Sequence, residues 1–294
     1  MVMRDAILDF AKQFEFQPKI SGRLPERNRF IVVGMGGSAL ASDILRIWRP
    51  ELDIKIHRDY GLPPISKNDA KETLVILSSY SGNTEEVIDA FSVAKKQKLS
   101  RAVLAVGGKL LELAKKEKVP YVQIPDTGIQ PRLALGYSFL GLLALVEDSR
   151  GLQEASKLSS VLNPENLQIL GKEIAEKLKG FLPVIYSSRR NGAIAYNWKI
   201  KFNETAKIPA FSNVLPEVNH NEMTGFDAEP STKHLGNKIK FIFLMDEEDG
   251  PRISRRFDVL KKIYEKEGFA VENLELKGQT RLEKIFNSSM CGEG

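Results

Sequence analysis

Cysteine is almost absent from this sequence of 294 residues, in which Cys291 is the only one. A single thiol excludes an internal disulfide and a thiolate metal cluster, and it is typical of a protein from a reducing cytoplasm. Histidine is also scarce, with three residues in the chain. The only acidic neighbours of His220 in its loop, Glu217 and Glu222, do not match the spacing of a zinc motif. We therefore expect a cytoplasmic protein without a metal site.

Long apolar runs and a strong charge imbalance are lacking as well. The most apolar stretch, residues 133–146, is too short to span a bilayer, and residues 1–14 have no signal-peptide core. The net charge of +5 is spread among acidic residues and does not form a basic face for nucleic acid. Hydrophobic content of 42% and charged content of 28% are typical of a soluble globular chain. We expect neither a membrane segment nor a nucleic-acid partner.

Apolar strand patterns alternate with helical patterns along the whole chain. The expected strands are short and apolar, and they cover residues 30–33, 54–56, 74–77, 102–106, 121–124, 182–186, 240–245 and 269–274. This alternation is typical of an α/β protein with doubly wound parallel sheets. A polar linker with a short helix at 149–166 divides the chain, and the second half repeats the scheme of the first. We therefore predict two flavodoxin-like domains, 1–150 and 151–294.

A polar turn follows the most clearly buried of these strands. The strand 74–77 is all aliphatic, residues 78–84 are polar apart from Gly82, and a helical pattern begins at Glu85. Hydroxyl groups and free backbone N–H groups at a helix N-terminus form a cup for an anion. The turn has no Gly-Lys-Ser/Thr ending, so a single phosphate monoester fits better than a nucleoside triphosphate. We expect Thr84 to cap the helix, with its hydroxyl accepting a hydrogen bond from the first turn. The alternative to an anion site is an ordinary helix with a serine or threonine cap.

A glycine-rich turn, residues 34–39, follows the first strand and forms a second candidate cup with Ser38 at its end. Its Gly34-x-Gly36-x-x-Ala39 spacing also fits a dinucleotide fingerprint, with Asp59 as the ribose ligand. The phosphate interpretation is favoured because Ser38 presents a hydroxyl group to the pocket. A second cup at 79–84 would also be superfluous for a pyrophosphate that already lies on the first helix.

Arg132 stands beside Pro131, which belongs in the first turn of the apolar helix 133–146. Its guanidinium group suits an anion or charge that develops during a reaction. The alternative is a solvated arginine at a helix start. Because the helix is apolar on nearly every side, we expect it to be buried and Arg132 with it.

Two proton-transfer candidates lie in the second half. On the expected helix 193–207, Glu204 continues a partly apolar row with Tyr196 and Ile200 at i, i+4 spacing. A carboxylate against apolar surface suits a general base, although an exposed helical glutamate is the simpler interpretation. His220 lies in the polar loop 217–223, and histidine transfers protons near neutral pH. With the phosphate cups, these groups predict an aldose–ketose isomerase that uses a cis-enediol and no cofactor.

The motifs that carry this interpretation also resemble a known family. They are Gly34-Met-Gly-Gly-Ser38, Ser79-Tyr-Ser-Gly-Asn-Thr84, Gln130-Pro-Arg132, Asn203-Glu204 and Asn219-His-Asn-Glu222. The second is similar to the phosphosugar signature of the sugar-isomerase (SIS) domain. In this order the motifs resemble the bifunctional phosphoglucose/phosphomannose isomerases, which have two SIS domains.

The resemblance implies conversion of glucose 6-phosphate and mannose 6-phosphate to fructose 6-phosphate. It implies phosphate contacts from a set of small and hydroxyl residues, namely Gly37, Ser38, Ser79, Ser81 and Thr84. It also implies catalytic roles for Arg132, Glu204 and His220, and a homodimer in which His220 reaches the neighbouring subunit's site.

The sequence departs from the family pattern after Cys291. Family members continue into a last helix with a lysine assigned to ring opening, whereas this sequence stops at Gly294 without a matching lysine. We therefore expect the second domain to lack that helix: either the sequence is a piece of a longer chain or ring opening proceeds otherwise. Two alternatives stay open, a non-catalytic SIS module that senses a phosphosugar and an SIS isomerase for another sugar phosphate.

Overall fold

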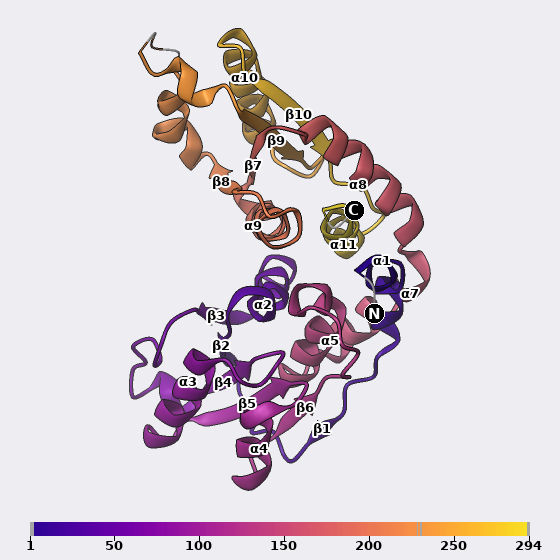
Figure 1. The fold of residues 1–294 in the computed structure, drawn as a ribbon. Coiled ribbons are helices and arrows are strands. Elements are labelled where there is room, and N and C mark those ends of the chain that lie inside the picture. Colours follow the sequence, from indigo (N-terminus) through magenta and orange to yellow (C-terminus); the bar gives the residue numbers. More distant parts are fainter. Residues whose placement is uncertain (1–2, 228, 230, 293–294) are drawn as a thin grey trace. The chain divides into compact units, whose positions relative to one another are not determined.

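The chain forms two compact units, Met1–Pro164 and Glu165–Gly294 (Figure 1). The computed structural model describes residues 3–227, 229 and 231–292. The boundary between them in the sequence falls in the first turn of a helix, α8 (Pro164–Leu178). The division into functional domains 1–150 and 151–294 stays a prediction.

The N-terminal unit contains a sheet of six strands within residues 3–164. In chain order they are β1 (Ile20–Ser21), β2 (Arg29–Val33), β3 (Asp53–His57), β4 (Thr73–Ser78), β5 (Ser100–Ala105) and β6 (Tyr121–Gln123). Their spatial order is β1-β6-β5-β4-β2-β3, and every neighbouring pair is parallel except β1 with β6. The doubly wound parallel sheet expected from the sequence is confirmed, with β1 as an additional antiparallel edge.

The helices of this unit cover both faces of the sheet (Figure 1). The α-helices are α1 (Met3–Leu8), α2 (Gly36–Trp48), α3 (Glu85–Lys96), α4 (Gly108–Lys116), α5 (Leu135–Leu145), α6 (Ser149–Ser156) and α7 (Leu158–Val161). Short 3₁₀ turns are η1 (Phe10–Glu15), η2 (Asp69–Lys71) and η3 (Pro131–Leu133). Side chains of α3 and α4 pack with β2, β4 and β5 in one apolar core, whereas α2 and α5 pack together on the opposite face.

The expected linker at 149–166 is largely helical, which corrects the sequence interpretation. Helix α6 packs on α5, and α7 packs on η1. The Asp148 side chain caps α6 by accepting from Gly151 N at 2.7 Å, and its Oδ2 pairs with Arg49 Nε at 3.0 Å. Only Gly151, Ala155 and Leu158 of these two helices are buried. The sequence therefore has few apolar residues here and gives only a weak helical pattern.

The strand order gives the N-terminal sheet a topological switch point at β2. The chain leaves β2 toward β3 on one side and later returns to β4 on the other side. In open α/β sheets, ligands bind at the carboxyl ends of the strands beside such a point. The two polar turns, residues 34–38 and 79–84, follow β2 and β4 there.

The C-terminal unit has a smaller parallel sheet in the order β10-β9-β7-β8. Its strands are β7 (Leu182–Ser188), β8 (Phe211–Leu215), β9 (Ile239–Met245) and β10 (Ala270–Glu275). Besides α8, its α-helices are α9 (Gly192–Lys201), α10 (Pro251–Lys266) and α11 (Arg281–Cys291). Short turns are η4 (Arg189–Asn191), η5 (Phe202–Ala206), η6 (Glu217–His220), η7 (Glu222–Phe226) and η8 (Lys233–Gly236). The α/β class predicted for this half is confirmed, although β8 was not expected.

Aromatic side chains fill one core of this unit. Tyr186, Phe241 and Phe243 from the sheet pack with Tyr264 of α10, and the ring centroids of Phe241 and Tyr264 are 4.2 Å apart. On the other face, α9 packs on β7, β8 and α11. Within the described residues, the fold contains no helix that combines the length and apolar character needed to cross a membrane.

Candidate active site

The turn after β4 is held together by its own hydroxyl groups. A hydrogen bond of 2.8 Å joins Ser79 Oγ to Thr84 Oγ1, and Gly82 N donates to Ser79 Oγ at 3.1 Å. Asn83 N donates to Ser81 Oγ at 3.2 Å. A hydroxyl that accepts from a backbone N–H group keeps its own hydrogen for another acceptor. The Ser79–Thr84 bond uses one hydroxyl hydrogen, and the hydrogens that remain make the turn a set of donors for an anion.

Thr84 differs from its expected role. It occupies the N-cap position of α3, but its side chain makes no capping hydrogen bond. Its hydroxyl pairs with Ser79 instead, which leaves the first-turn N–H groups of α3 without that cap. The capping prediction was wrong because a partner five residues back in the same turn competes with the local cap.

Gly82 gives this turn its shape. Its φ is +70°, in the region that glycine adopts without strain, and a Cβ added there would lie 1.8 Å from Gly107 O. The turn therefore packs its backbone directly on the loop before α4.

Ser38 links the two polar turns. It lies in the first turn of α2, where its Oγ accepts from Tyr80 N at 2.9 Å and its carbonyl oxygen accepts from Ser78 Oγ at 3.1 Å. The expected glycine turn is shorter than predicted, since α2 already begins at Gly36. The N-terminus of α2 and the turn after β4 thus form one assembly at the switch point of the sheet.

Arg132 approaches the same assembly through Gly37. A Cβ added to Gly37 would lie 2.7 Å from Arg132 N, so this contact requires glycine. Arg132 lies in η3, and only 6% of its surface is exposed. The solvated alternative for Arg132 is wrong, because η3 and the apolar helix α5 carry it into the interior.

Glu204 lies in a π-helical turn. The helix expected at 193–207 is α-helical only to Lys201, and η5 continues it as a π turn from Phe202 to Ala206. The side chain of Glu204 is half-buried. Such turns interrupt i, i+4 spacing and are frequent at functional sites. The row of Tyr196, Ile200 and Glu204 predicted from regular spacing therefore ends before the glutamate.

His220 is exposed at the end of η6, in a loop with several residues that are anchored to the rest of the unit. Glu222, two residues further on, accepts from Tyr186 Oη at 2.6 Å and from Asn213 Nδ2 at 2.5 Å. Val218 is completely buried, and Asn219 Oδ1 accepts from Arg256 Nη1 at 3.2 Å. The backbone that carries the exposed imidazole group is therefore held in place on both sides.

Tyr186 is a buried anchor of the His220 loop that sequence analysis missed. Burial, with Tyr264 and Glu222 nearby, raises the pKa of its phenol, so the hydroxyl keeps its proton and donates to Glu222. The available signal was a tyrosine at the end of a buried strand, where its hydroxyl needs a partner.

The C-terminal unit has an ionic network at the switch point of its own sheet. Lys284 Nζ of α11 contacts Asp246 Oδ1 at 3.1 Å, and Arg281 Nη1 contacts Asp246 Oδ2 at 2.9 Å. Burial raises the pKa of Asp246, but hydrogen bonds from Glu248 N, Asn191 and Lys284 outweigh it, and the pKa ends below its usual range. The charged side chains of Lys284 and Arg281 therefore lie at the sheet edge of this unit that corresponds to the hydroxyl donors of the first unit.

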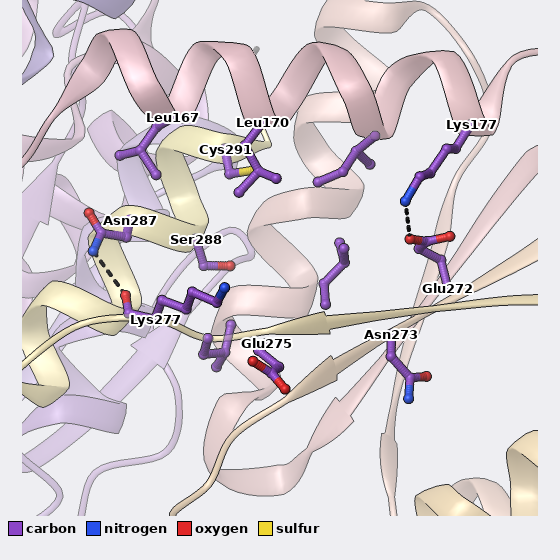
Figure 2. Close-up of a pocket in the computed structure, with 13 residues that line it drawn as sticks. Leu167, Leu170, Lys177, Glu272, Asn273, Glu275, Lys277, Asn287, Ser288 and Cys291 are labelled. Carbon is purple, nitrogen blue, oxygen red and sulfur yellow. Dashed lines mark hydrogen bonds and ion pairs between the residues drawn. The ribbon is translucent and has the colours of Figure 1, made fainter.

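A cavity of about 310 Å³ lies between α8, β10 and α11 of the C-terminal unit (Figure 2). Leu167, Leu170 and Cys291 lie along one side, and Asn287 Nδ2 donates to Lys277 O at 2.9 Å. Burial raises the pKa of the Cys291 thiol to about 12, which keeps it protonated. The lining of this cavity includes none of the site residues expected from the sequence.

The structure thus joins some candidates and not others. Ser38, Ser79, Ser81 and Thr84 share one assembly with Gly37 and Arg132 in the N-terminal unit. Glu204 and His220 lie in the C-terminal unit on η5 and η6, with β8 between them in the chain. Asp59, the ribose ligand of the dinucleotide alternative, is exposed two residues beyond β3 and accepts from Tyr60 N.

Known proteins resemble this chain over most of its length. Residues 168–293 match the family described as the bacterial phospho-glucose isomerase C-terminal SIS domain. The bifunctional phosphoglucose/phosphomannose isomerase of Aquifex aeolicus is 35% identical over 92% of this chain and 82% of that protein. The enzyme of the same name from Caldicellulosiruptor bescii is 35% identical over 96% of this chain and 87% of that protein.

A solved structure supports the fold alone. Glucosamine-6-phosphate deaminase from Thermotoga maritima matches with a TM-score of 0.70 and 16% identity, over 99% of this chain and 90% of that one. The identity and coverage of the two relatives are sufficient to establish the family. The chain is an isomerase that belongs to the bifunctional phosphoglucose/phosphomannose isomerase family.

Proposed function

We propose that this isomerase interconverts glucose 6-phosphate and mannose 6-phosphate with fructose 6-phosphate. The observation that carries the proposal is the assembly of Ser38, Ser79, Ser81 and Thr84 at the switch point of the N-terminal sheet. Ser38, Ser79 and Ser81 accept from backbone N–H groups. The Ser79–Thr84 bond uses one hydroxyl hydrogen, which leaves the other three hydrogens of this set to donate to phosphate oxygens. The N-termini of α2 and α3 add favourable partial positive charge. The family relatives supply the substrate class.

Isomerisation between an aldose and a ketose phosphate moves one proton between C1 and C2. Glu204 takes this proton and returns it to the neighbouring carbon, so that the reaction passes through a cis-enediol. Arg132 stabilises negative charge on the enediolate oxygen, and His220 exchanges protons with the sugar oxygens during ring opening. This scheme needs neither a metal ion nor a redox cofactor.

The loop of His220 supports its role and the proposal of a homodimer. The imidazole group is exposed, while Val218 and Glu222 on either side are fixed by packing and hydrogen bonds. An exposed residue on a rigid loop is suited to act on a neighbouring molecule. We therefore propose that His220 completes the site of a second copy of the chain, and that the dimer works in the cytoplasm.

A coupled assay on fructose 6-phosphate tests the function. The chain should form both glucose 6-phosphate and mannose 6-phosphate, and Glu204→Gln should lower both rates by about a hundredfold or more. Glu173→Gln changes an exposed glutamate of α8 and is the matched control. Fructose 6-phosphate should still bind to Glu204→Gln, because the hydroxyl assembly is intact.

Two outcomes would favour the alternatives. Binding of fructose 6-phosphate without turnover, in a chain whose Glu204→Gln variant behaves identically, would favour a phosphosugar sensor. Turnover of a different sugar phosphate, with neither hexose product formed, would favour another SIS isomerase. Near-normal turnover in Glu204→Gln would remove this residue from the mechanism.

A further inference from the structure

A groove of about 470 Å³ lies between α10 and the loop that carries His220. Three arginines of α10, Arg252, Arg255 and Arg256, line it together with Val259, Ile263 and Met223. The arginines occupy the first two turns of the helix and recur at spacings of three and four residues, so they share one face. The volume is in the range of small-molecule sites, which is about 300–1,000 Å³.

The positive charge of this groove is largely uncompensated. Arg252 and Arg255 are exposed, and within the described residues neither forms an ion pair. Arg256 uses its guanidinium group to donate to Asn219 at 3.2 Å. Within the part of the chain that the structure describes, the three guanidinium groups form no ion pair with a carboxylate, and they offer a forked set of donors for an anion.

The position of Arg252, in the first turn of α10, contradicts the charge preference of a helix. A helix N-terminus carries partial positive charge, and a cation in the first turn is unfavourable there. Helix α3 follows the preference, with Glu85 and Glu86 in its first turn and Lys95 and Lys96 in its last. Helix α10 has no acidic residue in its first turn. Departures from such local rules are expected at functional sites, where a ligand supplies the missing charge.

The part of the groove beyond the arginines has an apolar lining. Val259 is 48% exposed, and Met223 and Ile263 are partly buried beside it. A ligand that fits both parts has an anionic group and an apolar or planar group, and guanidinium groups also stack on planar rings. We propose that this groove binds a phosphate monoester with a planar apolar group, as in a nucleoside monophosphate. It is a second phosphate site, separate from the hydroxyl assembly of the N-terminal unit.

The groove is also connected to the residue before His220. Asn219 lines it and accepts from Arg256, so a bound phosphate group and Asn219 use the same guanidinium group. Occupancy of the groove therefore acts on one anchor of the catalytic loop proposed above.

Isothermal titration calorimetry of the full chain with adenosine 5′-monophosphate at low salt tests the proposal. We expect saturable binding that weakens about tenfold in the double variant Arg252→Gln, Arg255→Gln, because two charge-assisted contacts are lost. The double variant Lys262→Gln, Lys266→Gln removes the same charge from the same helix outside the groove and should bind normally. Adenosine without phosphate should not bind measurably.

Several results would overturn the proposal. They are the absence of saturable binding, equal weakening in the two double variants, or loss of binding in Thr84→Val, which would assign the ligand to the hydroxyl assembly. Tighter binding of a single-stranded DNA oligonucleotide than of the monophosphate would assign the arginines to nucleic acid. The isomerase proposal is tested separately by Glu204→Gln, so its failure and the failure of this proposal are distinguishable.

Discussion

The side-chain amide of Gln13 bonds to the backbone at Leu133, although 120 residues separate them. Gln13 Nε2 donates to Leu133 O at 2.6 Å, and its Oε1 accepts from Gly136 N at 2.9 Å. Gln13 is buried, with 3% of its surface exposed. It therefore satisfies the backbone at the junction of η3 and α5, directly after Arg132.

Gln13→Met should lower both stability and activity. The variant keeps the side-chain volume but leaves a buried carbonyl and a buried N–H group unpaired, which costs about 1–3 kcal/mol. Because Arg132 adjoins this junction, we also expect kcat/KM for fructose 6-phosphate to fall about tenfold at a temperature where the variant is folded. Denaturant unfolding and the coupled assay measure the two effects.

The exposed Gln17 gives the matched control. Gln17→Met should leave both quantities unchanged. If Gln13→Met lost stability but retained full kcat/KM, Gln13 would be a purely structural residue without influence on Arg132.

Thr84→Val should weaken substrate binding while the fold is retained. The variant is nearly isosteric but removes the hydroxyl that bonds to Ser79 Oγ at 2.8 Å and donates in the proposed phosphate site. We expect KM for fructose 6-phosphate to rise roughly three- to tenfold, as for the loss of a hydrogen bond of about 0.5–1.5 kcal/mol.

Thr84→Ser keeps the hydroxyl and should behave nearly as the parent chain. A KM in Thr84→Val equal to that of Thr84→Ser would show that this hydroxyl does not contact the phosphate group.

Lys284→Met should destabilise the C-terminal unit strongly. The Lys284 side chain is 3% exposed and the Asp246 side chain is completely buried, so the variant leaves a buried carboxylate without this partner. Loss of one partner of a buried pair costs about 3–5 kcal/mol. Lys179→Met, which breaks an exposed pair with Glu176, should leave stability nearly unchanged.

The effect of Lys284→Met should depend on pH. Because the pKa of Asp246 is lowered in the fold, its contribution to stability is present above the usual aspartate pKa of about 3.9 and is lost as the pH falls through the lowered value. The difference in unfolding free energy between parent and variant should therefore be large at neutral pH and shrink in acid. A difference that stays constant from pH 7 to pH 3, measured by urea unfolding, would contradict this account.

The strand that the sequence indicated most clearly, β4, is buried on both faces. Leu74, Val75, Ile76 and Leu77 are at most 1% exposed, so they formed an unbroken apolar run. Strand β8 lies at a sheet edge and includes the polar Ser212 and Asn213, and β1 has two exposed residues. Neither had a periodic signal because neither is enclosed by apolar neighbours.

For the candidate site, the sequence indicated the polar turn but not the local geometry within it. Hydroxyl residues after a buried strand indicated the polar turn at 79–84, the proposed phosphate site, since a parallel sheet gathers such turns at one edge. The partner of Thr84 and the π turn at Glu204 were not predictable, because local spacing favours a capped and regular helix in both places.

The sequence by itself determined the alternation of strands and helices, the two polar turns and the types of residue available for proton transfer. These features depend on local periodicity and on residues adjacent in the chain. Only the tertiary structure decided that Gly37 meets Arg132, that Gln13 bonds to Leu133 and that Lys284 pairs with Asp246. Such contacts join residues about forty to more than one hundred positions apart. They depend on how whole elements pack, which no local pattern encodes.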